Sequence, residues 1–144
     1  MSTIQTIYLA DDHNLVAKGI ASIMLQITNI ESVEIFSNGK ELYDACVKKL
    51  PTVVFLDVEM PIWDGRTTLV ALKEKFPTLR CLMLSMLNEK LMIEDCLEKG
   101  ASGYLNKDCS VIELQEAIFS TNEYYFSKEA LKSMSGFSKK TIEK

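Results

Sequence analysis

The chain has 144 residues, of which 47% are hydrophobic and 25% are charged. This length and composition suit one globular domain with a sizeable core. The net charge of -4 gives no sign of a broad nucleic-acid surface, because such surfaces are strongly basic. No apolar run approaches the length needed to span a bilayer, which excludes a membrane-spanning helix.

The four cysteines are far apart along the chain and include no C-x-x-C pair. They are Cys46, Cys81, Cys96 and Cys109. Such spacing argues against a zinc site and against a disulfide-bonded secreted fold, and it is typical of reduced thiols. The chain also has no basic and then apolar leader segment. We therefore expect a cytoplasmic protein.

Five short apolar runs are predicted to be strands, and each is followed by residues at helical spacing. The runs are Ile4–Ala10, Ser32–Phe36, Val53–Leu56, Leu79–Leu84 and Ala101–Leu105. After the first run, Val16, Ile20, Ile23 and Ile27 share one helical face. The alternation predicts a parallel sheet covered by helices on both faces. Right-handed crossovers then favour an α/β, doubly wound fold.

Helix boundaries can be predicted in the second half of the chain. Asn88 is a candidate N-cap for the fourth helix, and Gly100 is a candidate stop for the same helix. Ser110 and Glu113 form a capping-box pattern that opens the fifth helix. After Thr121 the periodicity weakens, although Ser127 could cap a short helix. We therefore predict a domain over residues 1–121 and an extension or linker over residues 122–144.

Polar residues stand at the ends of four predicted strands. Asp11 and Asp12 end the first strand, Asp57 the third and Ser85 the fourth, and Lys107 follows the fifth. In open α/β sheets, ligands bind beyond the carboxyl ends of the strands. Two like charges about 4 Å apart repel by roughly 4 kcal/mol at an effective dielectric near 20. Lys107 and a Mg²⁺ ion would offset this repulsion. The same site would suit an incoming phosphoryl group, with Asp57 as the nucleophile that attacks its phosphorus.

Several of these residues also have simpler interpretations. A lone Asp at a strand end more often caps the next turn than carries chemistry. Glu59 either lines a phosphoryl pocket or is a solvated loop acid. Tyr104 is either functional or a packed aromatic at a strand end. His13 fits a helix entry or a surface position better than a ligand.

Four segments together resemble the receiver domain of two-component response regulators. They read LADDH, FLDVEMPIWDG, LMLS and GASGYLNKD. The spacings from Asp57 to Ser85 and from Ser85 to Lys107 are typical of that family. His13, Gly19-Ile20 and the tail NEYYFSKEA are similar to the LuxR/NarL-type subfamily. The resemblance implies a flavodoxin-like (βα)5 fold with a five-stranded sheet in the order 2-1-3-4-5.

The resemblance also implies a role for each site residue. Asp57 would be the phosphoacceptor, supplied by a sensor histidine kinase. Asp12 and Asp57 would bind Mg²⁺ directly, together with the backbone carbonyl of Glu59, while Asp11 would act through water. Those roles make the chain a signalling domain whose only reactions are its own phosphorylation and dephosphorylation.

The remaining implied roles concern the conformational change that would follow phosphorylation.

Lys107 would pair with the phosphoryl oxygens, Ser85 would turn to hydrogen-bond them, and Tyr104 would swing inward. One departure from the family is Asp108, which stands where a proline often follows the lysine. A cis bond there would lack the proline effect and cost about 2.5–4 kcal/mol, which leaves its geometry open.

Output would pass through the fourth helix, fifth strand and fifth helix, with a homodimer through the first and fifth helices as another contact. DNA would be bound only by a further C-terminal domain that is missing here, so we expect a shortened chain of a transcription regulator. The alternatives are a stand-alone phosphoacceptor and an aspartate-nucleophile phosphatase. Phosphatases of that kind need an Asp two residues after the nucleophile, where this chain has Glu59. The glycine-rich phosphate loops are also missing.

Overall fold

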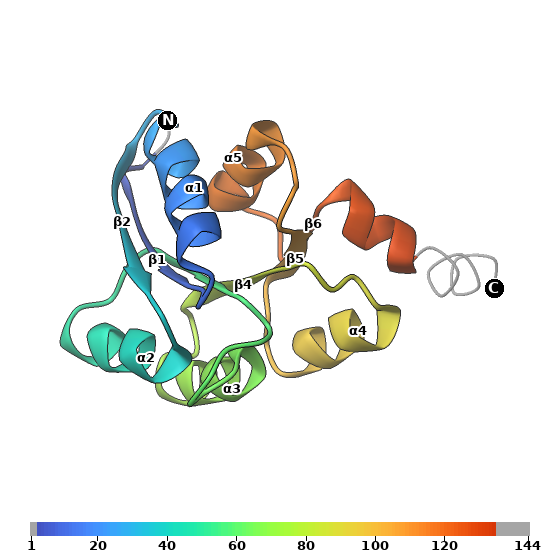
Figure 1. Cartoon of the computed structure of the whole chain (residues 1–144), viewed down its shortest axis with the longest axis horizontal. Coiled ribbons are helices and arrows are strands. Elements are labelled where there is room, and N and C mark those ends of the chain that lie inside the picture. The colour runs from blue at the N-terminus through green and yellow to red at the C-terminus, as the bar shows by residue number, and fades with distance from the viewer. Residues whose placement is uncertain (1–2, 135–144) are drawn as a thin grey trace.

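A computed structural model of the chain describes residues 3–134. In this part the strands form one parallel sheet in the order β2-β1-β3-β4-β5-β6 (Figure 1). The strands are β1 (Gln5–Ala10), β2 (Ile30–Phe36), β3 (Val53–Leu56), β4 (Arg80–Ser85), β5 (Gly103–Asn106) and β6 (Tyr125–Phe126). The predicted fold class and the order of the first five strands are confirmed. The sixth strand is an addition that the sequence did not indicate.

Helices cover both faces of the sheet. They are α1 (Asn14–Leu25), α2 (Gly39–Lys48), α3 (Gly65–Lys75), α4 (Lys90–Glu98) and α5 (Val111–Phe119). One face packs against α1 and α5, and the other packs against α2, α3 and α4 (Figure 1). Because all four residues of β3 are buried, its side chains serve both cores. This explains why the strand is an unbroken apolar run, as expected for a parallel strand buried on both faces.

Local details confirm some helix predictions and correct others. The capping box of Ser110 and Glu113 is present at the start of α5, and Gly100 follows the end of α4 with φ of +107°. Asn88 is not the cap of α4, because the helix begins one residue later, after Glu89, whose side chain makes no capping hydrogen bond.

The buried face of α1 also differs from the prediction. It consists of Ala17, Ile20, Ala21 and Met24, whereas Val16 and Ile23 are exposed. The helix face that approaches the sheet is therefore the one that carries the two small alanines, while Ile27 is buried just beyond the helix.

The segment after α5 packs onto the domain. Tyr125 and Phe126 pair with β5, and residues 128–134 form a helix. Ala130 and Met134 of that helix belong to the core cluster that includes Tyr104. The helix predicted after Ser127 is thus present, while residues 135–144 lie outside the described part of the chain. Among the described residues, no helix is both long enough and apolar enough to pass through a bilayer.

Candidate functional site

Two acidic residues are fixed at the carboxyl edge of the sheet by the strands that precede them. Asp11 follows β1 and Asp57 follows β3, and these two strands are neighbours. The backbone N–H of Asp57 donates to the carbonyl of Ala10 at 3.0 Å, and that of Asp11 donates to Phe36 at 2.9 Å. The strand ladders therefore extend as far as the acids and hold both carboxylates at one place.

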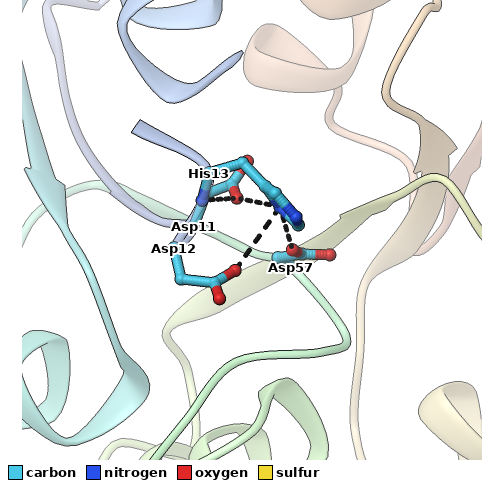
Figure 2. A group of neighbouring side chains, drawn as sticks. All are labelled: Asp11, Asp12, His13 and Asp57. Carbon is cyan, nitrogen blue, oxygen red and sulfur yellow. Dashed lines mark hydrogen bonds and ion pairs between the residues drawn. The ribbon is translucent and has the colours of Figure 1, made fainter. Parts of the chain in front are cut away.

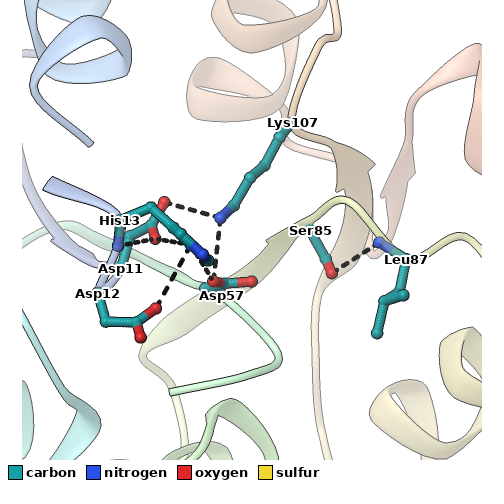
Figure 3. Close-up of polar contacts among 7 residues, drawn as sticks. All are labelled: Asp11, Asp12, His13, Asp57, Ser85, Leu87 and Lys107. Atoms are coloured by element: carbon teal, nitrogen blue, oxygen red, sulfur yellow. Dashed lines mark hydrogen bonds and ion pairs between the residues drawn. The ribbon is translucent and has the colours of Figure 1, made fainter. Parts of the chain in front are cut away.

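Lys107 lies between these two carboxylates (Figure 3). Its Nζ is 2.9 Å from Oδ2 of Asp11 and 3.0 Å from Oδ2 of Asp57. The three side chains are 4%, 1% and 6% exposed, in the order Lys107, Asp11 and Asp57. The lysine is held there because its backbone N–H donates to the carbonyl of Ser85 at 2.9 Å. Residues from three strands thus form one buried ionic cluster.

The cluster holds two acids and one base, and its electrostatics reflect that imbalance. Burial raises the pKa of the Asp57 carboxyl, and the contact with Lys107 opposes this rise only in part. The charge of Asp11 raises the pKa of Asp57 further. Burial alone would lower the pKa of Lys107, but its contacts with Asp11 and Asp57 outweigh burial and raise it. A second cation at this edge would therefore stabilise the ionised acids.

Asp12 and His13 complete the group of candidate metal ligands (Figure 2). One ligand atom from each of Asp11, Asp12, His13 and Asp57 can be chosen so that all four atoms lie within 4.8 Å of one another. Oδ2 of Asp11 is buried and accepts no hydrogen bond from the described residues, although Lys107 lies beside it. Carboxylate oxygens are the ligands that Mg²⁺ prefers, so the residues present fit such an ion.

Ser85 and Tyr104 contact the same residue of the loop after β4. Oγ of Ser85 accepts a hydrogen bond from the N–H of Leu87 at 3.0 Å (Figure 3). The hydroxyl of Tyr104 donates to the carbonyl of Leu87. Tyr104 is fully buried, and burial raises its pKa to about 12. The tyrosine points inward in this structure, and the inward swing on phosphorylation that the resemblance implies stays a prediction.

Two predicted features lie at the margin of the site. Glu59 is exposed, and its side chain is not one of the four candidate ligands, so the role of its backbone carbonyl stays a prediction. The bond between Lys107 and Asp108 is trans, since the described residues contain no cis peptide bond.

His13 lies at the entry of α1 and its side chain is exposed, as the sequence predicted, but its ring also lies close to the acids of the site. It is the N-cap of α1, as a helix entry should be, but its side chain makes no capping hydrogen bond. Instead, Nδ1 lies 3.3 Å from Asp11, 3.4 Å from Asp12 and 3.9 Å from Asp57 (Figure 2). Its position directly after two acids was the one available signal.

A doubly wound parallel sheet with acids and a lysine at its carboxyl edge defines a receiver-type signalling domain. The family model described as response regulator receiver domain matches residues 7–119, and the chain belongs to that family. Receiver domains are signalling domains, not enzymes that turn over a separate substrate.

Individual relatives agree with the LuxR/NarL type that the sequence suggested. The nitrate/nitrite response regulator NarL of Escherichia coli is 32% identical over 113 residues, covering 78% of this chain and 52% of NarL. The transcriptional regulatory protein LnrK of Bacillus subtilis is 28% identical over 116 residues, covering 81% of this chain and 53% of LnrK. The chain thus spans about half the length of these curated relatives.

Solved structures confirm the fold. The crystal structure of a LuxR-family two-component response regulator from Aurantimonas matches with a TM-score of 0.87 and 22% identity. The match covers 94% of this chain and 99% of that one. Because the two sequences differ so much, this likeness concerns the fold alone.

Proposed function

We propose that Asp57 accepts a phosphoryl group from the phosphohistidine of a sensor kinase and that the resulting change controls an output, most directly transcription. The buried Asp11–Lys107–Asp57 cluster is the observation that supports this best. It presents a carboxylate at the carboxyl edge of the sheet with a fixed ammonium beside it. The cytoplasm is the proposed location, where the four free cysteines would stay reduced.

In the transfer step, an oxygen of the Asp57 carboxylate attacks phosphorus and forms the O–P bond of an acyl phosphate. The P–N bond to the kinase histidine breaks, and its electron pair goes to the ring nitrogen, which takes up a proton from water. Lys107 stays within reach of the incoming oxygens and offsets their charge. A bound Mg²⁺ would offset the remaining phosphoryl charge, held by Asp12 and Asp57 with Asp11 beside them.

Ser85 links the phosphoryl site to the loop before α4. At present its hydroxyl oxygen accepts the N–H of Leu87, while the carbonyl of Leu87 accepts the hydroxyl of Tyr104. If Ser85 turns to donate its hydroxyl to a phosphoryl oxygen, Leu87 loses a partner and the support of Tyr104 changes. The new charge at Asp57 would thereby bias a two-state packing around Tyr104.

The segment of residues 125–134 is the part of the chain that would receive this change. The N–H of Ser127 donates to the carbonyl of Tyr104 at 3.2 Å. Oγ of Ser127 accepts the N–H of Asn106 at 3.2 Å and the N–H of Ala130 at 3.3 Å. Ser127 therefore joins β5 to the start of the helix over residues 128–134, through which we propose that a following DNA-binding domain is controlled.

Gly103 of β5 allows the segment of residues 125–134 to lie close to that strand. A Cβ on Gly103 would lie 1.9 Å from the carbonyl oxygen of Tyr125. The segment therefore fits against β5 only because that position has no side chain.

A homodimer through α1 and α5 is the second part of the proposal. These two helices are neighbours and carry exposed apolar side chains near their N-terminal ends. They are Leu15, Val16, Val111 and Ile112. Light scattering should detect a dimer that is weakened by Ile112→Asp, and a monomer at all concentrations, with and without beryllofluoride, would overturn this part.

Phosphorylation itself is tested by mass spectrometry. Incubation with Mg²⁺ and acetyl phosphate should add one phosphoryl group to the chain, and Asp57→Ala should gain none. A chain that gains no mass with several small donors and with a cognate kinase contradicts the proposal. Turnover of a generic phosphatase substrate that is lost in Asp57→Ala would favour the phosphatase alternative instead.

The route to the C-terminal segment is tested by amide hydrogen exchange. Beryllofluoride, which mimics a phosphoryl group on Asp57, should lower the protection of the Ala130 amide roughly tenfold, about 1.4 kcal/mol of local opening. Ser127→Ala should lower it without beryllofluoride. Ser133→Ala is the matched control, because its hydroxyl contacts only the exposed Glu129 carbonyl in the same helix. Unchanged protection in both experiments would contradict the route.

A further inference from the structure

We propose that the imidazole of His13 is a ligand of the divalent ion at this site and gives the site a preference for first-row transition ions over Mg²⁺. The proposal rests on the proposed function for the existence of a metal site. It adds a ligand and the class of ion that this ligand favours. The relevant contacts are those between Nδ1 of His13 and three carboxylates (Figure 2).

The spacing of these atoms suits one six-coordinate ion. With ligands about 2.1 Å from an octahedral ion, neighbouring ligand atoms are about 3.0 Å apart and opposite ones about 4.2 Å. Nδ1 of His13 is 3.3 Å from Asp11, 3.4 Å from Asp12 and 3.9 Å from Asp57. All three separations lie between those limits, and the four ligand atoms lie within 4.8 Å of one another, so small side-chain shifts would bring them around one ion.

The backbone holds the imidazole on this side of α1. The N–H of His13 donates to Oδ1 of Asp11 at 2.9 Å, which ties the residue to the buried acid. As the N-cap, His13 would be expected to satisfy the first turn of α1, yet its side chain makes no capping hydrogen bond. Its ring is 63% exposed, so an ion can reach it from solvent.

A nitrogen ligand changes which ions the site prefers. Mg²⁺ is bound by carboxylates, carbonyls and water, whereas imidazole suits ions such as Ni²⁺, Zn²⁺ and Fe²⁺. Affinity for a mixed nitrogen and oxygen site generally rises from Mn²⁺ to Cu²⁺. Loss of an outer-shell partner alone typically costs 10-fold to 100-fold in metal affinity. Removing His13 should therefore weaken Ni²⁺ binding by at least about tenfold and leave Mg²⁺ binding nearly unchanged.

The chain offers a clean spectroscopic test, because His13 is its single histidine. In untagged protein loaded with Mn²⁺, any imidazole ¹⁴N coupling seen by pulsed electron paramagnetic resonance comes from this residue. We expect the coupling in the natural chain and its loss in His13→Asn. Asn is itself a favourable N-cap, so the variant should fold, which circular dichroism would verify.

Calorimetry of Ni²⁺ and Mg²⁺ binding provides the second measurement. The ratio of the two affinities should fall at least about tenfold in His13→Asn and stay constant in Asn14→Ala, an exposed neighbour outside the site. Mn²⁺ binding without imidazole coupling, or an unchanged ratio in His13→Asn, overturns the role of His13. Phosphorylation of Asp57 would survive that result, so the two proposals fail separately.

Discussion

Two ionic clusters of this domain have the same number of members but opposite compositions. At the sheet edge, one lysine lies between two acids, Asp11 and Asp57. Between α3 and α4, one acid, Asp95, lies between Arg66 at 3.0 Å and Lys99 at 2.6 Å. The first cluster is almost fully buried, whereas the side chains of the second are between 29% and 38% exposed.

The two environments shift the acids in opposite directions. The contacts with Lys99 and then Arg66 lower the pKa of Asp95, because burial there is slight. At the sheet edge, burial is the larger influence and raises the pKa of Asp57 despite its contact with Lys107. The outer cluster is thus electrically satisfied and joins two helices. The inner cluster is short of positive charge, which an additional cation would offset.

The largest effect should come from removing the buried lysine. Lys107→Met leaves two buried carboxylates facing each other and should lower the free energy of unfolding by about 3 kcal/mol without divalent ions. Urea unfolding in EDTA measures this loss. Added Mg²⁺ should recover part of it, and Lys99→Met should cost less than about 1 kcal/mol. Equal costs for the two lysines would remove the distinction between the clusters.

Neutralising Asp57 should have the opposite effect on the free energy of unfolding. Asp57→Asn removes a charge that burial and Asp11 disfavour, and it should raise the free energy of unfolding at pH 7 by about 1 kcal/mol. Urea unfolding in EDTA again provides the measurement. The gain should shrink when Mg²⁺ is added, because only the natural acid binds the ion. A loss of stability in EDTA would mean that the Lys107 contact outweighs burial.

Removing the acid of the outer cluster should lower stability only slightly, and the loss should depend on pH. Asp95→Asn should cost less than about 1 kcal/mol, since exposed pairs contribute little. The pKa of Asp95 is lowered in the folded state, so its contribution is present above the ordinary value of 3.8. It should disappear as the pH falls through the lowered folded-state pKa. Thermal unfolding of both chains at a series of pH values tests this, and a difference that grows with acid would contradict it.

The smallest expected difference between the two clusters is in how salt changes the stability cost of their substitutions. The screening length falls from about 10 Å at 0.1 M to about 3 Å at 1 M ionic strength. The cost of Asp95→Asn should therefore shrink by a few tenths of a kcal/mol at 1 M sodium chloride. The cost of Lys107→Met should change little, because the side chains of that contact are almost fully buried. Similar salt effects on both variants would show that the inner cluster is open to solvent.

Much of the fold could be predicted, because polar residues mark the point where each apolar strand ends. Apolar runs that stop at Asp11, Asp57 and Lys107 place these residues at one edge as soon as the strands are parallel. Their convergence follows from topology and does not depend on any single side-chain conformation. The role of each residue in phosphoryl transfer stays a prediction.

Features that depend on tertiary contacts could not be predicted in this way. Strand β6 has only two residues, and it exists because Gly103 leaves space for the carbonyl of Tyr125. The direction of the His13 ring depends on a hydrogen bond from its own backbone to Asp11. The link from Ser85 to Tyr104 passes through the backbone N–H and carbonyl of Leu87. Because every residue type has these groups, the presence of a leucine there does not indicate the link.

The two-residue strand β6 also decides which edges of the sheet meet solvent. At one border, β2 carries Glu31 and Glu34, and such charges discourage pairing with another chain. At the other border, β6 covers β5, which reads Gly-Tyr-Leu-Asn and has no charge of its own. A shorter chain cut after residue 121 would uncover the backbone groups of this strand. We expect such a fragment to self-associate and to be less soluble than the chain that keeps its own cover.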